Sequence, residues 1–532
     1  MQSLTIKSFE GGISSFADKG IRGAFKFASG IDIRKAVDTL SCGQAMREEG
    51  LFDTSHSQSP SLSQSTSQSP SGSTSSSPSP SNSPSKSSSP SASGSRSASK
   101  SLSPSASSSP SSSVSSSLSP SAGLNNVYVD LVLFWVKASD GNTYGFGNAG
   151  NIYRRFPDGF TRNVYKDSRG AIKGAIEKPS SGATYLQWAT DTRVMQKPLP
   201  GASNWSDATE VADNLTGTDW HTMRQVGGAN YIANGSKLAL VGYDDSWTNE
   251  ALDVIPGRYI KTIIERNGRA VVGTYPAGYP NKGVNGAIDC EVPLVQIGDD
   301  GNLFFANFTD SMPTKRFPGG GRVNPGGVAN EVDQIEMFDW VFGADSWIDR
   351  QTLGNMSIWG VFDADSGKNG LYYYGRKNKE QPFTLNLEYA MDVDEIGAVT
   401  NVDGVTIASY RDGTDFGVRA VDSTTKAQGD WQGLEYRTPT KKAEQITKFS
   451  HVEVFMDTLP TGCSVYFYYQ KNKSGDWVQA YTADGNAAFT STGGKKATFR
   501  IGEEMDIFEP RVVMIPSANT TPEIFRIVTY FN

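Results

Sequence analysis

The sequence predicts an all-β protein: β-propeller-like repeated meanders, a C-terminal antiparallel β-sandwich, and a disordered serine-rich insert. Three observations support this prediction. Alternating apolar runs separated by Gly, Asp and Asn turns recur over residues 127–435, as expected for repeated hairpins. A second series of short strands with Gly-containing turns occupies residues 438–532. From Ser55 to Ser121 every odd-numbered residue is serine.

The composition limits the possible classes of protein. A chain of 532 residues is expected to form roughly two to four folded units. Its hydrophobic content is only 37%, because the serine-rich stretch dilutes a remainder that is rich in Gly and aromatic residues. The net charge is −7 without a run of Lys or Arg. Direct nucleic-acid binding is therefore disfavoured, since phosphate contacts need clustered cations.

The cysteines and the first residues indicate whether the chain folds in the cytoplasm or is exported. Cys42, Cys290 and Cys463 are odd in number and far apart, which argues against a disulfide framework and for folding in a reducing cytoplasm. The first residues lack a charged region followed by an apolar run, so we expect no signal peptide. No segment has the roughly 18 consecutive apolar residues of a membrane span.

The serine-rich stretch separates a short N-terminal segment, residues 1–53, from the rest. A Ser-x repeat has the period of a β-strand, but its prolines remove ladder hydrogen bonds and neither face is apolar. Residues 54–123 are therefore predicted to be a disordered linker rich in Ser and Pro. In the N-terminal segment, FKF at 25–27 and IDI at 31–33 predict short strands. A short helix is expected from Val37 through GQAMREEG.

Two roles of the serine segment stay open. As an interdomain tether, it connects an N-terminal docking segment to a separate propeller. As a loop, it leaves a continuous β domain in which strands such as GIDIR at 30–34 complete the first or last blade. The tether predicts that a cut within residues 55–121 releases the first 50 residues. The loop predicts that they stay bound.

Residues 124–437 form the predicted propeller-like domain. Asp-Gly and Ala-Gly-Asn between alternating apolar residues are hairpin signals. Similar units recur roughly every 40–50 residues and give about six or seven possible blades, with divergent β-sandwich repeats as the alternative. The first expected strands are 127–138, 143–146 and 151–156, with turns at 139–142 and 148–150.

Residues 438–532 are predicted to form the β-sandwich domain. Short strands such as HVEVFM, SVYFYYQ and KATFRIG alternate with turns that contain Thr-Gly, Lys-Ser-Gly, Asp-Gly and Gly-Gly. This pattern is typical of a separate antiparallel sandwich.

One acidic loop has the composition of a calcium site. Asp363, Asp365 and Asn369 form a DxDxGxN array, and oxygen ligands at alternating loop positions suit Ca²⁺. The twelfth loop position is Tyr374 and not an acid, and the segment lies between two predicted strands. A hairpin turn is therefore favoured, and no metal ligand is predicted.

Other motifs indicate turns more than catalysis. The turn at 138–144 resembles the Asp-box of sialidase-type propellers, which also need an arginine trio and a Tyr nucleophile. The glycines at 319–321 lack the Lys-Ser/Thr of a phosphate loop and are expected in an inter-blade loop. Three histidines, His56, His221 and His451, leave little for general-base or zinc chemistry. The acid pairs expected as solvated turn formers are Asp244–Asp245 and Asp299–Asp300.

Aromatic residues on the predicted strands are expected mostly in the blade core. Alternation places Tyr372 and Tyr374 on one face of a strand and Tyr373 on the other. Some of these aromatics could line a sugar-binding surface, and the sequence does not select which. The other tryptophans on predicted strands are Trp135, Trp188 and Trp359. In sum, no catalytic, cofactor-binding or metal-binding residue is predicted, no cofactor is expected, and the chain is predicted not to be an enzyme.

Several stretches resemble β-propeller proteins of tailed-bacteriophage virions, in the tail or adsorption apparatus. They are FEGGIS…GAFKFASGIDIRK near the start, SDGNTYGFGNAGNIYRR after the serine segment, and LPTGCSVYFYYQ…FRIG…FEPRVVMIPS…TPEIFRIVTYF in the last domain. The resemblance covers about four-fifths of the chain, and the serine segment departs from it. It implies a protein that is made in the host cytoplasm and assembled into a virion.

The expected function is that of a non-enzymatic virion structural protein. Its expected partners are other virion proteins, and we expect the chain to form a homo-oligomer in the particle. Host-surface glycan is a further candidate partner, and no direct nucleic acid and no membrane span are expected. One alternative is a host-surface glycan-binding adhesin or depolymerase on the propeller scaffold. Another is a surface protein with a mucin-like stalk, for which the sequons at Asn204, Asn307 and Asn355 permit glycosylation.

Overall fold

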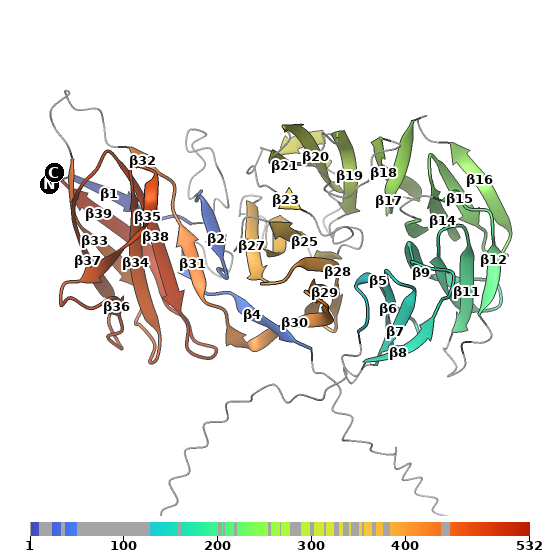
Figure 1. Cartoon of the computed structure of the whole chain (residues 1–532), viewed down its shortest axis with the longest axis horizontal. Coiled ribbons are helices and arrows are strands. Elements are labelled where there is room, and N and C mark those ends of the chain that lie inside the picture. Colours follow the sequence, from blue (N-terminus) through green and yellow to red (C-terminus); the bar gives the residue numbers. More distant parts are fainter. Residues whose placement is uncertain are drawn as a thin grey trace, which may run out of the picture. The chain divides into compact units, whose positions relative to one another are not determined.

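The computed structural model describes the β-structured parts of the chain (Figure 1). All regular elements among the described residues are strands. The predicted linker, residues 54–123, lies outside them. The described residues are 2–9, 24–32, 38–49, 128–156, 161–199, 205, 208–217, 221–253, 257–266, 268–276, 289–297, 303–312, 315–323, 329–332, 340–341, 351–353, 356–363, 369–375, 384–437 and 447–532, with the backbone alone for most of 258–385.

The helix expected from Val37 onward is not formed, and the prediction was wrong. The segment contains β3 (Leu40–Ser41), which pairs with β39 (Glu523–Phe531), and β4 (Gln44–Glu48), which pairs with β30 (Asp415–Lys426). A short isolated helix is marginal in water. Pairing with strands far away in the sequence therefore overrides the local preference.

Antiparallel sheets follow one another from residue 132 to residue 426. The first three are β5 (Val132–Lys137), β6 (Thr143–Gly147), β7 (Asn151–Arg155) and β8 (Thr161–Lys166); β9 (Gly174–Pro179), β10 (Thr184–Ala189), β11 (Val194–Leu199) and β12 (Thr209–Ala212); and β13 (Met223–Val226), β14 (Ala229–Asn234), β15 (Lys237–Val241) and β16 (Trp247–Asp253). Next are β17 (Arg258–Arg266) with β18 (Arg269–Pro276), and β19 (Asp289–Ile297), β20 (Leu303–Met312), β21 (Lys315–Val323) and β22 (Ala329–Val332). The last two are β24 (Gln351–Leu353), β25 (Met356–Asp363), β26 (Gly370–Gly375) and β27 (Thr384–Ala390), with β23 (Trp340–Val341) also on β25; and β28 (Glu395–Val402), β29 (Val405–Asp412), β30 and β4.

The first strands of these sheets form a ring. In order, β5 contacts β9, β9 contacts β13, β13 contacts β17, β17 contacts β19, β19 contacts β24, β24 contacts β28, and β28 contacts β5. Within the described residues, seven first strands therefore close on themselves, which is the arrangement of a β-propeller. A ring of sheets buries faces that one sheet alone would expose. The predicted propeller is confirmed.

One blade is completed by the N-terminal segment. In the sheet β28-β29-β30-β4, Arg419 pairs with Glu48 and Val421 with Met46. The same segment also reaches the sandwich, because β1 (Gln2–Ile6) pairs with β39 and β2 (Phe27–Ser29) pairs with β31 (Gly429–Gln432). Residues 2–48 therefore contribute strands to both the propeller and the sandwich.

The sandwich has two layers. One layer contains β1, β33 (Lys448–Met456), β37 (Lys496–Glu504) and β39. The other contains β31, β32 (Tyr436–Arg437), β34 (Ser464–Lys471), β35 (Ser474–Thr482), β36 (Ala488–Phe489) and β38 (Ile507–Ile515). Strand β35 also pairs with β37 and joins the layers.

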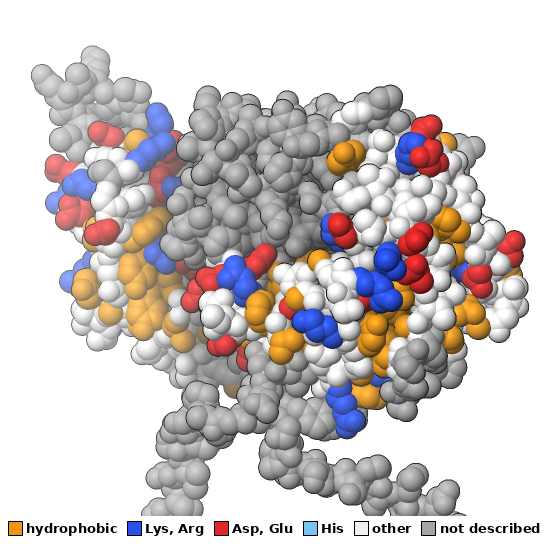
Figure 2. All heavy atoms as spheres, turned by 45° about the vertical axis from the view of Figure 1, so that its right-hand side comes forward, with side chains coloured by type: hydrophobic (Ala, Val, Ile, Leu, Met, Phe, Trp, Pro, Cys, Tyr) orange, Lys and Arg blue, Asp and Glu red, His pale blue; other side chains and the backbone are white. Residues whose placement is uncertain are grey.

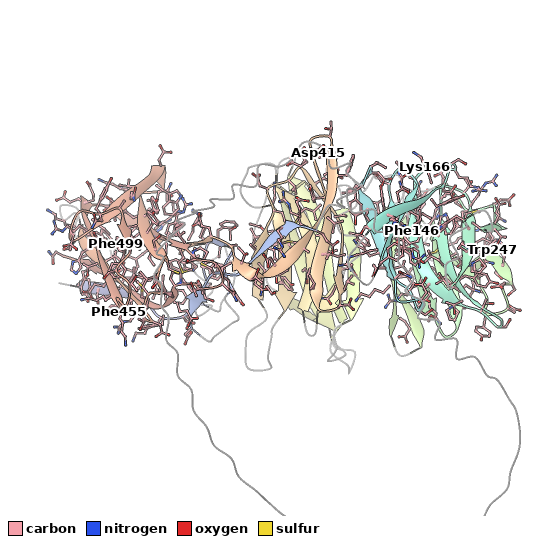
Figure 3. The ribbon with its side chains drawn as sticks, turned by 90° about the horizontal axis from the view of Figure 1, so that it is seen from below. Phe146, Lys166, Trp247, Asp415, Phe455 and Phe499 are labelled. Carbon is pink, nitrogen blue, oxygen red and sulfur yellow. The ribbon has the colours of Figure 1, made fainter. Side chains whose placement is uncertain are left out.

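Alternation along the strands separates the sandwich core from its surface. In β33, Phe449, Val452 and Val454 are buried, whereas the intervening Glu453 and Phe455 are only partly buried. The ring of Phe449 stacks on Phe508 of the other layer at 4.9 Å. Figure 3 shows the same separation, with Phe499 inside the domain and Phe455 at its surface. Each fully buried aromatic side chain contributes about 2–3 kcal/mol to folding.

Candidate functional site

The Asp-box-like turn is a hydrogen-bonded hairpin. The amide of Gly141, at φ +81°, donates to the carbonyl of Ala138 at 3.0 Å. The Asp140 carboxylate accepts the Asn142 amide at 3.0 Å and the Tyr144 hydroxyl at 2.7 Å. Burial and the bond to Asp140 raise the pKa of Tyr144. The Asp140 carboxylate thus stabilises the turn, as expected of Asp at such a position.

A second carboxylate in this blade was not predicted. Asp130 is buried and accepts the Ala149 amide at 2.8 Å, the Asn151 side-chain amide at 2.9 Å and the Tyr153 hydroxyl at 2.5 Å. Burial, and next the Asp130 charge, raise the pKa of Tyr153. A Cβ at Gly147 would lie 2.1 Å from an Asp130 oxygen, so a larger residue there would displace this buried carboxylate. The expected strand 127–138 starts later than predicted: Asp130 lies before it, and β5 begins at Val132.

The two flanks of the serine segment both contact strand β7. On the side before it, Arg155 donates from Nε to Glu49 at 2.8 Å, and both side chains are 12% exposed. On the side after it, the Val129 amide donates to the Tyr153 hydroxyl at 3.0 Å. Tyr153 and Arg155 are both in β7. We name these contacts the closure seam (Glu49, Val129, Tyr153 and Arg155), because the residues on both sides of the serine segment reach β7 there.

The aromatic residues on strands lie largely in the core. Trp135 and Trp188 are buried, and the Trp188 indole donates to the buried Asp167 at 2.8 Å. Tyr372 and Tyr373 are also buried and belong to different hydrophobic clusters, as expected from alternation. The side chains of Trp359 and Tyr374 lie outside the described residues.

The predicted turn acids that are described have structural roles. Asp244 accepts the Ser246 hydroxyl at 2.6 Å, and this bond lowers the pKa of Asp244. Asp245 pairs with Lys178, whose side chain is 1% exposed and comes from the neighbouring blade. The pair Asp299–Asp300 lies outside the described residues.

Two loop predictions can be compared with the structure. The glycines at 319–321 were expected in an inter-blade loop, which is wrong, because they lie within β21. All three pair with β20, and Gly320 and Gly321 pair with β22 as well. Of the calcium array, Asp365 and the side chain of Asp363 lie outside the described residues. The Asn369 side chain donates to the Val393 carbonyl at 3.2 Å. Within the described residues, no group of three or more His, Cys, Asp or Glu side chains is placed to hold a metal ion.

His221 lies at the junction of two blades. Its ring nitrogens contact the carbonyl of Ala233 at 2.8 Å and that of Asp191 at 2.9 Å. A neutral ring can donate to only one of these carbonyls. Burial lowers the pKa of His221, against the two backbone contacts that raise it. The side chain is fully buried, so the residue joins two blades in the core.

The described surface mixes charges of both signs. On the face drawn in Figure 2, Lys and Arg side chains lie among Asp and Glu. Typical neighbours are Lys173 with Asp191 at 2.6 Å and Lys237 with Glu250 at 2.5 Å. No helix in the described part of the chain is long and apolar enough to cross a membrane. Among the described residues, Cys42 and Cys463 are buried free thiols.

The comparisons with known proteins find only low similarity, in sequence and in structure. No protein-family model matches the chain, and no curated protein matches it in sequence. The WD40 domain of Neurospora crassa Pan2 is 8% identical and covers 56% of this chain and 90% of its own, with a TM-score of 0.34. The β-propeller domain of Myceliophteria thermophila Cps50 (Swd1) is 9% identical and covers 56% of this chain and 98% of its own, with a TM-score of 0.35. The assignment of the fold therefore rests on the sheet order and on the ring of contacts between first strands, and these make the chain a β-propeller protein with an added β-sandwich.

Proposed function

We propose that this chain is a non-enzymatic structural protein of the virion of a tailed bacteriophage, in the tail or adsorption apparatus. The observation that carries the proposal is how the chain uses the stretches that resemble such proteins. FKFASGIDI contains β2, which pairs with β31, and EIFRIVTYF forms β39, which pairs with β1 and β3. The resembling stretches from both ends of the sequence thus build one connected β-structure.

The proposed role is to bind other proteins of the particle and not to turn over a substrate. In the blade with the Asp-box-like turn, the Asp140 carboxylate bonds to groups of its own turn, and the Asp130 carboxylate accepts from four donors. Buried free thiols at Cys42 and Cys463 fit synthesis in the host cytoplasm. We propose a homo-oligomer in the virion, without direct contact to nucleic acid and without a membrane span.

Mass spectrometry of phage particles purified on a density gradient tests this proposal. We expect the chain to co-sediment with major tail proteins at a fixed stoichiometry and to be depleted from the soluble lysate. Absence from intact particles would overturn the proposal. Release of reducing sugars from host capsule by the purified chain would instead favour the depolymerase alternative.

A further inference from the structure

The outer face of one sandwich layer carries a row of polar and aromatic side chains. Across the strands, Gln479 of β35 is opposite Tyr468 of β34, Tyr468 is opposite Arg511 of β38, and Arg511 is opposite Gln432 of β31. All four side chains are partly exposed. With adjacent strands about 4.8 Å apart, the row is about 14 Å long. We name it the sandwich row; Trp477 and Asp430 lie beside it.

Arg511 is held rigidly at the centre of the row. Its Nε donates to Asp430 at 2.9 Å and its Nη2 to the second carboxylate oxygen at 2.5 Å. The guanidinium carbon lies 5.6 Å from the Tyr468 ring centre and 5.5 Å from that of Trp477. A guanidinium has five N–H donors, and the two bonds to Asp430 leave three. Acceptor and donor groups thus stand side by side between two rings.

The polar groups around Arg511 have unused hydrogen-bonding capacity. Among the described residues, the hydroxyls of Tyr466 and Tyr468 and the indole N–H of Trp477 have no protein partner. None of these atoms belongs to the buried polar atoms that lack a partner, so they face solvent. They are therefore available to a ligand.

The outer face of the opposite layer differs in this respect. There the Tyr530 hydroxyl donates to Glu453 at 3.0 Å, and Lys496 donates to the same carboxylate at 2.7 Å. Arg526 covers the Phe455 ring at 3.8 Å. The Tyr530 hydroxyl and the Lys496 ammonium are thus both bonded to Glu453, so this face serves as an internal control for the sandwich row.

Charge and chemistry select one class of ligand. Arg511 is neutralised by Asp430, and Lys26 is paired with the buried Glu509 at 2.9 Å in the same layer. An anionic ligand would therefore meet no uncompensated cation. Sugar hydroxyls both donate and accept, and the C–H face of a pyranose packs on an aromatic ring. We infer that the sandwich row binds a neutral oligosaccharide. This site goes beyond the proposed virion role and does not depend on it.

Binding of the full chain to immobilised neutral glycans tests the inference. The probe set contains oligomers of glucose, galactose, mannose, rhamnose and N-acetylhexosamine, with oligogalacturonate as the acidic probe. We expect binding to at least one neutral oligomer and none to the acidic probe. Trp477→Ala should weaken binding by about tenfold, the loss of one stacked ring. Tyr468→Phe, which keeps the ring and removes only the hydroxyl, should weaken it by a smaller factor.

The control variant is Phe455→Ala on the opposite layer, which should leave binding unchanged. Thermal unfolding of each variant verifies that the sandwich remains folded. No binding across the neutral set, preference for oligogalacturonate, or equal loss in Phe455→Ala and Trp477→Ala would each overturn the inference. None of these outcomes affects detection of the chain in purified particles, so the two proposals fail separately.

Discussion

We predict that the Glu49–Arg155 ion pair of the closure seam stabilises the closed propeller ring. Glu49 and Arg155 are each 12% exposed. Replacing Arg155 by Met leaves the Glu49 carboxylate mostly buried without its counter-charge. Loss of one partner of a buried ion pair costs about 3–5 kcal/mol, and the residual solvent access lowers this to about 2–3 kcal/mol. We expect Arg155→Met to reduce the free energy of unfolding of the propeller by that amount.

The double variant Glu49→Leu/Arg155→Met separates the charge from the packing. Because no buried charge remains, it should recover most of the loss and return to within about 1 kcal/mol of the unchanged protein. Urea unfolding measures the free energies. Hydrogen exchange reports the local effect, since the Glu49 amide donates to the Val418 carbonyl at 2.9 Å and Arg419 pairs with Glu48. Exchange of these amides should accelerate in Arg155→Met only.

Two results would refute this reasoning. One is a change below about 0.5 kcal/mol in Arg155→Met, which is the range of exposed pairs. The other is faster exchange spread over all blades with no preference for β4 and β30. Either result would mean that the ring is closed independently of the seam.

Three further predictions follow from described contacts. A protease site placed within residues 54–123 should be cut without releasing the N-terminal fragment on native size-exclusion chromatography, because β1 to β4 pair with later strands; release under native conditions would favour a tether. Burial lowers the pKa of His221, so the unfolded state binds its proton more readily, and stability should fall below about pH 6.5. The slope of unfolding free energy between pH 7.5 and 5 should be smaller in His221→Gln, and equal slopes would contradict the assignment to His221. Burial raises the pKa of Cys42 to about 11, so this thiol should react with a thiol reagent at pH 8 only after unfolding in urea, and rapid labelling of the native chain at Cys42 would contradict its burial.

The sequence predicts those features that depend on neighbouring residues. The turn at 139–142 follows from Asp140 and Gly141 alone, because the Asp140 side chain bonds an amide two residues on. Alternation correctly separated Tyr372 from Tyr373. Each of these two signals depends only on residues a few positions apart in the sequence.

Features that depend on distant partners could not be predicted in this way. The segment from Val37 was expected to be helical, because nothing nearby shows that β30 would pair with it. The glycines of β21 were predicted to lie in a loop, because glycine has a low strand propensity. In the structure they lie in a strand that pairs with both β20 and β22. The role of Asp130 could not be predicted from the sequence, because the Tyr153 hydroxyl reaches its carboxylate only in the folded blade. Likewise the sandwich row unites four strands, and no motif in any one of them marks it.

The pairing of β1 with β39 has a mechanical consequence. Gln2 is opposite Phe531, so the first and last strands lie side by side with these residues at the same end (Figure 1). A pulling force applied at Gln2 and Phe531 would open the pair one hydrogen bond at a time, as a zipper opens, and not shear all its bonds together. Such a geometry yields at low force. Tension between these two ends would therefore separate the outer strand of the sandwich before it loads the ring of blades.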